Sequence, residues 1–447
     1  MTGMVIFTRS AVKMQSINYI TGESWRYSPQ AQIVAIDPNK KDSTVHILTA
    51  DFFSARNPQI SYDGNFLLFT AQLKPSDPWQ IWEMNLKNLR SRKVISSNDN
   101  CIDPAYLSGD RLVFSKLDLN DKLKGGYSLY TCHLDGSNIS RITFNPHTYF
   151  ASNQLKDGRI LTISRQLYPE NGVQKLMILR PDGTKCEIFY ELTEGSTLLS
   201  QAIETANGHV IFIEKTKSLS TGGTLVSIRY NRPLHSRDNL SSAIEGDFLA
   251  VSKQSSGKLL VSYRKSDAER FALYEFDPEK KMIGNVIYKN RGFDVLESVV
   301  VGLNEMPKKL PSEVDTGVKT GQLLCQDINV IKDQFQSNSI ASQLYRIEVA
   351  GIDSILGVVQ VEQDGSFYLK IMADKPFKIK TIDINGKLIQ GPGDWIWLRP
   401  NERRGCIGCH EDHELAPENR VPLAVKKSPV SLPIHVMKIV EKKISLE

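Results

Sequence analysis

The chain has 447 residues, enough for two or three domains, and its 40% hydrophobic and 23% charged residues are typical of a globular protein with a buried core. The formal net charge of +5 is small for this length, and no stretch of Lys and Arg is dense enough to follow a phosphate backbone, which argues against nucleic-acid binding. No window approaches the roughly 18 consecutive apolar residues of a membrane span, so none is expected.

Most of the chain repeats a unit of two short strands separated by a loop. The first strand follows a turn that contains Gly, as in SYDGNFLLF, LSGDRLVF, LKDGRILTI, TANGHVIFI and QSSGKLLVSY. The second strand alternates polar and apolar residues and ends in a polar turn, as in WQIWEMNLKN and FALYEFDPEKK. In each of these five copies the first strand begins with an apolar residue: Phe66, Leu112, Ile160, Val210 and Leu259. Consecutive members of this series are 46, 48, 50 and 49 positions apart.

This regular spacing predicts a six-bladed β-propeller over residues 1–304. A period of about 40–50 residues with several strands is typical of that fold, in which each blade buries its faces by stacking on its neighbours. A sixth copy, GMVIFTRS followed by AQIVAIDPNKK, begins the chain, and NPQISYDGNFLLFTA resembles the blades of TolB-type propellers. The later segment FDVLESVVVGLNE is expected to return to the first blade and close the ring. Residues 305–316, with two prolines and no periodicity, are expected to be a linker.

Residues 317–447 keep the strand patterns but lose the blade repeat. The stretches QLYRIEVAG, SILGVVQVEQDGSFYLKI and FKIKTIDINGKLIQ predict a small antiparallel β-sandwich with turns at Asp364-Gly365 and Asn385-Gly386. Trp395 and Trp397 alternate on one face near its edge, and core packing is favoured for them over contact with a cofactor. The whole chain is therefore expected to be all-β.

The predicted sandwich carries the motif Cys406-Ile-Gly-Cys409-His410. The CxxCH spacing is typical of c-type haem attachment, in which each Cys sulfur bonds a vinyl group of the haem and the adjacent His binds the iron. The CxxC spacing also serves zinc, and His413 would then complete a set of four ligands with the three motif residues.

Four further cysteines occur singly within strand patterns. We expect them to be buried core residues, with a disulfide as the alternative, at Cys101, Cys132, Cys186 and Cys325.

The residues beside the motif indicate how one haem could be held. Gly405 and Gly408 leave room for a porphyrin face. The propionates could pair with three basic residues, the alternative being a solvated basic edge: Arg403, Arg404 and Arg420.

His410 is the expected axial ligand of the iron, and the opposite position is expected to be open or to hold water. His413 is a secondary candidate for a metal ligand. His133 and His147 are expected in propeller loops, where a surface position is favoured over one that faces the haem.

The order of these elements resembles the hydrazine synthase alpha subunit family. The similarity extends over most of the chain and is most specific from Asp364 to Val425, in DGSFYLKI and in GDWIWLRPNERRGCIGCHEDHELAPENRVPLAV. The resemblance implies a propeller followed by a middle domain in which Cys406 and Cys409 hold a c-type haem through thioethers.

Two departures from that family limit what the resemblance implies. The family subunit continues into a domain with a second c-type haem, whereas no second CxxCH occurs here. In the family a tyrosine just beyond the motif ligates the middle haem and the motif His turns to zinc. Here Glu414 stands near that place and no tyrosine follows Tyr368, so hydrazine synthesis by this chain alone is not expected.

Together these features predict an extracytoplasmic monohaem c-type cytochrome that carries electrons or takes part in redox chemistry of small nitrogen compounds. If it is an enzyme, we expect a haem-dependent oxidoreductase with a redox protein or other subunits as partners. The alternative is a protein-binding propeller whose Cys/His cluster holds structural zinc. The N-terminal MTGMVIFTRSAVKMQ does not resemble a signal peptide, so a periplasmic or other extracytoplasmic location would require a leader that is not in this sequence.

Overall fold

The computed structural model describes residues 1–13, 29–40, 44–118, 126–216, 221–330, 345–408, 414 and 419–434. The chain divides into two compact units, Met1–Ser312 and Glu313–Glu447, and both are built from β-strands. The 3-10 turn η2 (Leu423–Lys426) belongs to the second unit. None of the helical segments in the described ranges is long and apolar enough to cross a membrane.

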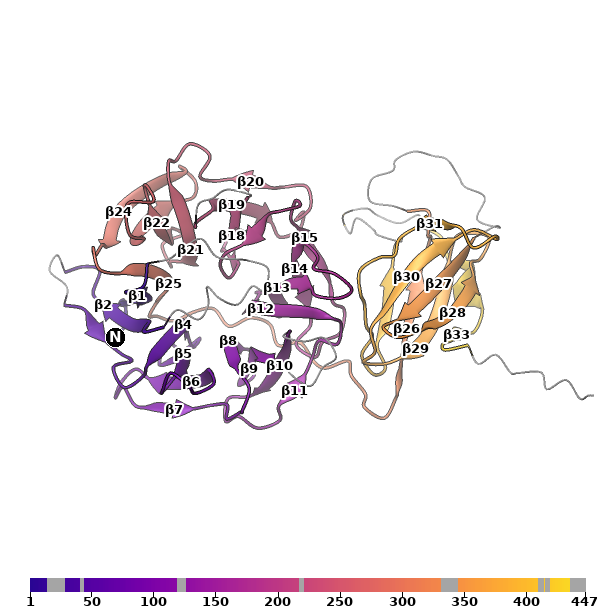
Figure 1. Cartoon of the computed structure of the whole chain (residues 1–447), viewed down its shortest axis with the longest axis horizontal. Helices are drawn as coiled ribbons and strands as arrows, with labels where there is room; N and C mark the ends of the chain where they lie inside the picture. The colour runs from indigo at the N-terminus through magenta and orange to yellow at the C-terminus, as the bar shows by residue number, and fades with distance from the viewer. Residues whose placement is uncertain are drawn as a thin grey trace, which may run out of the picture. The chain divides into compact units, whose positions relative to one another are not determined.

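The first unit is a ring of small sheets, and the described residues form six of them (Figure 1). Two sheets contain β4 (Ser54–Ile60), β5 (Phe66–Gln72), β6 (Gln80–Asn85) and β7 (Ser91–Lys93), then β8 (Cys101–Leu107), β9 (Arg111–Leu117), β10 (Tyr127–His133) and β11 (Ser140–Arg141). The next two contain β12 (His147–Gln154), β13 (Ile160–Gln166), β14 (Gln174–Leu179) and β15 (Glu187–Glu191), then β16 (Thr197–Leu198), β17 (Ile203–Glu204), β18 (His209–Lys215), β19 (Thr224–Arg229) and β20 (Asp238–Asn239). A fifth contains β21 (Asp247–Lys253), β22 (Leu259–Arg264), β23 (Ala272–Asp277) and β24 (Met282–Tyr288).

The remaining sheet closes the ring. Its order is β25-β1-β2-β3, so that the last propeller strand pairs with the first strand of the chain. The pairing is antiparallel and places Val300 opposite Val5. The expected return of FDVLESVVVGLNE to the first blade is thereby confirmed, with β25 (Asp294–Val300), β1 (Val5–Ser10), β2 (Gln32–Ile36) and β3 (His46–Ile47).

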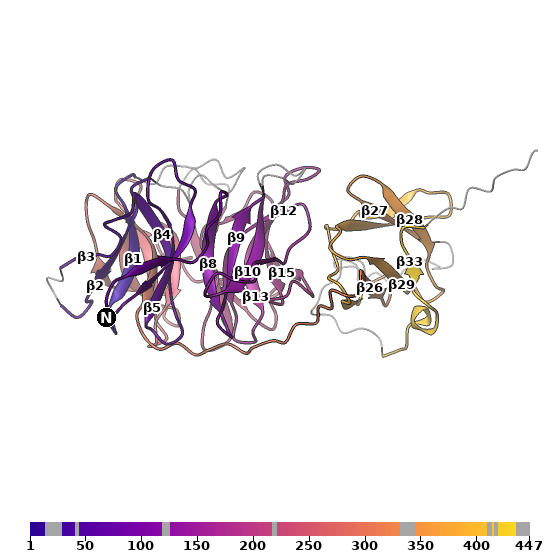
Figure 2. The same cartoon turned by 90° about the horizontal axis from the view of Figure 1, so that it is seen from below.

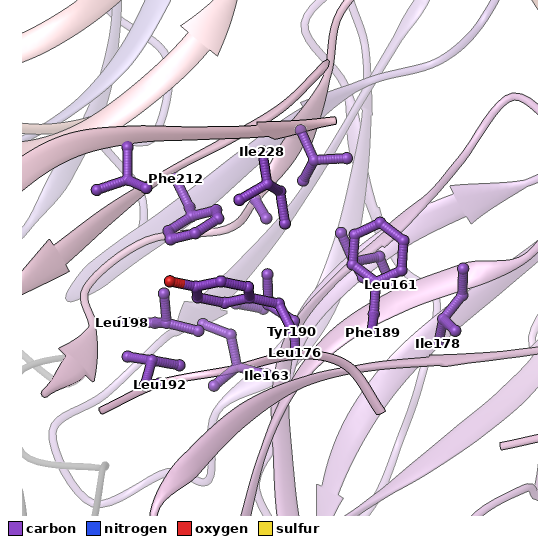
Figure 3. Packing of buried hydrophobic residues seen from close by; sticks show 14 of the residues in the cluster. Leu161, Ile163, Leu176, Ile178, Phe189, Tyr190, Leu192, Leu198, Phe212 and Ile228 are labelled. Atoms are coloured by element: carbon purple, nitrogen blue, oxygen red, sulfur yellow. The ribbon is translucent and has the colours of Figure 1, made fainter. Parts of the chain in front are cut away.

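The core of the ring lies between neighbouring blades. Figure 3 shows one cluster, in which side chains of β13–β15 pack against those of β18 and β19. The Tyr190 and Phe212 rings are 5.3 Å apart there, and Phe212 is completely buried. Burying a large apolar side chain contributes about 1.5–3 kcal/mol, so each blade stabilises the blades beside it. Similar clusters lie between further pairs of neighbouring blades.

A strap formed by residues 302–312 crosses one face of the ring after β25 (Figure 2). The strap includes most of the segment that was predicted as a linker. Its backbone bonds the turns of successive blades: Asn304 N donates to Tyr62 O at 2.9 Å, and Lys308 N donates to Lys156 O at 3.0 Å. Ser108 Oγ donates to Lys308 O at 3.1 Å. Residues 305–312 therefore belong to the propeller unit as a docked extended segment.

The position of the strap explains why one of the repeated turns requires glycine. Gly158, in the turn LKDG, has φ +93°, and a Cβ there would lie 2.2 Å from Lys308 O and 2.9 Å from Leu310 Cγ. The turn therefore needs glycine for its left-handed backbone and also for the close approach of the strap. Periodicity cannot reveal the second requirement, because the strap has no regular secondary structure.

The second unit is a sandwich of two four-stranded sheets. One has the order β32 (Arg403–Cys406), β26 (Thr320–Cys325), β29 (Phe367–Met372), β33 (Val430–Ser431). The other has the order β28 (Ile355–Gln360), β27 (Arg346–Gly351), β30 (Phe377–Ile382), β31 (Leu388–Gln390). Apolar residues from both sheets form one core, with Ile347, Val349, Leu369 and Phe377 completely buried.

The expectation of a purely antiparallel sandwich is wrong at the edges of the first sheet. There β32 runs parallel to β26, and β33 runs parallel to β29. Parallel neighbours need long connections. The chain supplies them because these edge strands come from its C-terminal part and not from hairpins.

We predict that Gly158→Ala destabilises the propeller more than the matched change Gly257→Ala. Gly257 ends an equivalent turn with φ +85°, but nothing lies within 4 Å of the place that a Cβ would take. Both changes place alanine in a left-handed conformation at a cost of about 1–2 kcal/mol. Only Gly158→Ala also pushes against the strap, which adds about 1–3 kcal/mol. Urea unfolding of the full chain measures the difference, and equal losses would show that the strap is not seated on this turn.

Candidate haem-attachment site

The CxxCH motif begins at the end of an edge strand. Cys406 is the last residue of β32, and the parallel register places it beside Cys325 at the end of β26. Two backbone bonds continue this pairing beyond the strands: Gln326 N donates to Cys406 O at 2.9 Å, and Asp327 N donates to Ile407 O at 3.1 Å. These bonds hold the start of the motif at the rim of the sandwich, where the Cys406 side chain is half-buried.

The two glycines of the motif region differ in their surroundings. Gly405 is exposed, and nothing lies within 4 Å of the place where a Cβ would be. Gly408 is buried, and a Cβ on it would lie 2.2 Å from Val330 O. The expectation that Gly408 leaves room for a porphyrin face is therefore wrong, whereas the Cβ position of Gly405 is open. Gly408 is needed because the backbone of residues 327–330 passes against it, a reason that the sequence did not reveal.

The chain is anchored again at the far side of residues 409–418. The Arg420 guanidinium forms an ion pair with Asp364 Oδ2 at 2.7 Å and another with Asp327 Oδ2 at 3.1 Å. It also donates to Asp364 O at 2.7 Å. Asp327 follows Gln326, which bonds Cys406, so both ends of the intervening segment are attached to the same extension of β26.

Asp364 collects the bonds that dock the segment after Arg420. Its carboxylate accepts hydrogen bonds from Ser366 Oγ at 2.6 Å and from Leu423 N at 2.7 Å, and Ser366 Oγ in turn accepts one from Ala424 N at 3.0 Å. Burial alone would raise the pKa of Asp364. The hydrogen bonds from Ser366 and Leu423 and the charge of Arg420 outweigh burial and hold that pKa below its ordinary value.

The other two arginines next to the motif have different surroundings. Arg404 donates to Oε1 of the buried Glu402 through Nε at 2.9 Å and Nη2 at 2.7 Å. The second oxygen of Glu402 accepts a bond from Arg399 N at 2.7 Å, so this carboxylate is fully used. Arg403 is exposed on the face of β32 opposite to that of Arg404. Within the described residues its guanidinium forms no ion pair.

Comparison with known proteins identifies the region that contains this site. The family model for the hydrazine synthase alpha subunit middle domain matches residues 318–411. Hydrazine synthase subunit alpha of Kuenenia stuttgartiensis is 22% identical over 519 aligned positions, which cover 86% of this chain and 63% of that protein. The solved structure of Kuenenia stuttgartiensis hydrazine synthase is similar with a TM-score of 0.82 at 19% identity, covering 95% of this chain and 72% of the matched chain.

Residues 318–411 match the hydrazine synthase alpha subunit middle domain, and the chain as a whole is similar to that subunit. The chain spans 63% of the length of this curated relative. The structure of TolB from Acinetobacter baumannii is also similar, with a TM-score of 0.49, 12% identity and coverage of 67% of this chain and 66% of TolB.

Several predicted site residues lie outside the described part of the chain: Cys409, His410 and His413. The described candidates divide into two groups. Cys406, Arg404 and Arg420 are brought to the two anchor points of the motif segment, whereas Arg403 points away from the sandwich core.

The remaining sequence expectations have mixed outcomes. Trp395 and Trp397 are 6% and 1% exposed, which confirms core packing. The single cysteines are buried, as expected, and none of them forms a disulfide within the described residues: Cys101, Cys132, Cys186 and Cys325.

The expectation for the two propeller histidines is wrong. His133 ends β10 and is half-buried, and His147 begins β12, where it is 6% exposed with Nδ1 2.9 Å from Ser164 Oγ. Strand pairing extends further into both segments than their polar neighbours suggested.

Sequence reasoning missed the three carboxylates that position the motif, Asp327, Asp364 and Glu402. Asp364 was expected only as a turn residue before glycine, and that turn does form, with Ser366 N donating to Asp364 Oδ1 at 3.1 Å. Arg420 lies 93 positions from Asp327, so no local pattern marks that pair. Glu402, in contrast, binds Arg404 and the backbone of Arg399, two and three positions away.

We predict that Asp364→Asn lowers the free energy of unfolding of the second unit by about 1–3 kcal/mol at neutral pH, because Arg420 loses a charged partner. Hydrogen exchange at Leu423 and Ala424 should become faster. A carboxyl group with a lowered folded pKa stabilises the fold above its unfolded pKa of about 3.9, and this contribution is lost as pH falls through the folded pKa. The difference between wild type and variant should therefore vanish in strong acid.

Asp383→Asn is the matched control. Asp383 accepts backbone bonds from Asn385 and Lys387 in a similar turn, and neither bond reaches a distant segment. The asparagine oxygen can accept both bonds, so this variant should lose little stability. A loss as large as that of Asp364→Asn, or a loss that persists unchanged in strong acid, would contradict the role given to Asp364.

Proposed function

We propose that this chain is a monohaem c-type cytochrome of the hydrazine synthase alpha subunit family, with haem bonded through Cys406 and Cys409. The observation that carries the proposal is the placement of the motif. Cys406 lies at the rim of the sandwich, and residues 408 and 420 are both anchored to the extension of β26. This arrangement supports a motif segment that is attached to the sandwich at both ends, with the half-buried Cys406 at the rim.

The chemistry of the described residues fits a haem. The half-buried thiol of Cys406 supplies one attachment atom. Gly405, the residue before it, is exposed and has no described atom within 4 Å of its Cβ position. Arg403 is the best candidate to pair with a propionate, because Arg404 and Arg420 already have carboxylate partners. A propionate at either of those two arginines would have to compete with Glu402 or Asp364.

The roles of the remaining residues follow from the motif. His410 is proposed as the axial ligand, with the opposite position open or filled by water and His413 as a secondary candidate. A bound haem would supply one-electron chemistry at its iron, and the protein would supply attachment, charge compensation and access. The proposed process is electron transfer or redox chemistry of a small nitrogen compound, carried out with a redox protein or other subunits in an extracytoplasmic compartment.

The alternative function is a protein-binding propeller whose Cys/His cluster holds structural zinc. Cys406, Cys409, His410 and His413 would be the ligands, and tetrahedral thiolate and imidazole coordination is typical of such sites. Metal analysis of protein expressed with and without haem maturation separates the two proposals. Stoichiometric zinc with no covalent haem after maturation would favour zinc.

We predict that Cys406→Ser and Cys409→Ser each abolish stable covalent haem, because a serine oxygen does not form the thioether bond. Haem staining after denaturing electrophoresis measures the loss. The unfolding transition of unit Met1–Ser312 should not change, since it is a separate compact unit with its own core. Cys186→Ser is the control, because Cys186 is a buried propeller residue and its loss should leave haem attachment intact. Full covalent haem in both motif variants would contradict the assignment.

We also predict that the reduced, haem-bearing protein binds carbon monoxide, because an open position opposite His410 leaves the iron free to take a small ligand. The shift of the Soret absorption band measures binding. A low-spin spectrum that carbon monoxide does not change would show two protein ligands and would restrict the haem to electron transfer.

A further inference from the structure

A third cysteine lies directly beside the CxxCH motif. In the parallel register of β26 and β32, Cys325 is the partner of Cys406. Cys325 is 1% exposed and belongs to the sandwich core, and Cys406 packs against the same core from the end of β32. Both side chains therefore lie on the inner face of this sheet, at neighbouring positions.

The spacing of neighbouring strands brings two such cysteines within reach of a disulfide. Adjacent strands are about 4.8 Å apart, and the Cα atoms of disulfide-bonded cysteines are about 4.4–6.8 Å apart. In-register parallel neighbours have Cβ atoms slightly further apart than the roughly 3.5–4.5 Å of a relaxed bridge. Among the described strands β32 is an edge strand that pairs with β26 on one side, so its end can make the small shift that bonding requires.

We propose that Cys325 and Cys406 form a reversible disulfide in protein that has no haem attached, and that this bond controls haem attachment. The oxidant is a small or protein disulfide, such as glutathione disulfide. Its sulfur first bonds the more accessible Cys406 and releases one thiol. The Cys325 sulfur then displaces the second thiol, so that two protein thiols are oxidised and one disulfide is reduced to two thiols.

The consequence for haem attachment rests on the function proposed above. The Cys406 sulfur can bond either Cys325 or a haem vinyl group, but not both. Oxidation therefore blocks attachment, and reduction of the disulfide restores the free thiol. Cys325 is shielded in the core, so the bond, once formed, is protected from thiols that do not shift the edge strand.

The disulfide can be mapped on full-length protein expressed without haem maturation. The protein is incubated with glutathione disulfide or with dithiothreitol, unfolded in acid, alkylated with N-ethylmaleimide and cut with trypsin. Cys325 lies in the tryptic peptide of residues 320–332, and both motif cysteines lie in that of residues 405–420. We expect these two peptides to be joined after oxidation, with a mass about 2 Da below the sum of the unbridged peptides, and to be separate after reduction.

The variant Cys409→Ser removes the competing motif cysteine and should retain the joined peptides, whereas Cys325→Ser should abolish them. A bridge confined to residues 406 and 409, with Cys325 fully alkylated in both wild type and Cys409→Ser, overturns the proposal. Haem attachment is then measured on the two wild-type samples, where oxidised protein should take up several-fold less covalent haem. If neither sample takes up haem, the cytochrome function fails while the disulfide result still stands.

Discussion

The parallel pairing of β32 with β26 is the interaction on which the candidate site depends. It places Cys406 at the rim of the sandwich, and its continuation to Asp327 seats Ile407 and Gly408 against the backbone of the β26 extension. The same extension supplies the Asp327 carboxylate that holds Arg420 on the far side of the motif segment. A one-residue slip of β32 would turn Cys406 to the other face of the sheet and would misplace every one of these contacts.

The propeller depends on different interactions. Its blades must bury both faces of each sheet, and the backbone groups at the sheet edges need hydrogen-bond partners. Clusters of apolar side chains between blades serve the first need, and the pairing of β25 with β1 serves the second by joining the two ends of the ring. The strap then uses the turns of successive blades as hydrogen-bonding partners, which ties the chain to the ring before it enters the second unit.

The three reactions considered for the second unit all involve the sulfur of Cys406. A thioether to haem, a bond to zinc and a disulfide to Cys325 all require this atom, and they exclude one another. The carboxylates around it have no part in that choice, because Glu402 and Asp364 are engaged with Arg404 and Arg420. They fix the backbone on either side of the motif segment, and Arg403 is exposed beside it.

The sequence alone was sufficient to predict the blade repeat and the strand that returns to the first blade, and to locate the CxxCH motif. These features are local, because turn residues and alternating strands are encoded within each stretch of the chain, and the motif spacing is set by the chemistry of attachment. The parallel edges of the sandwich, the strap over Gly158, the closeness of Cys325 to Cys406 and the bonds from Asp327 and Asp364 to Arg420 were decided by tertiary structure. Their partners are distant along the chain, and a single sequence carries no signal for which distant strands become neighbours. Those pairings are determined only in the packed sandwich, where buried backbone N–H and C=O groups need partners.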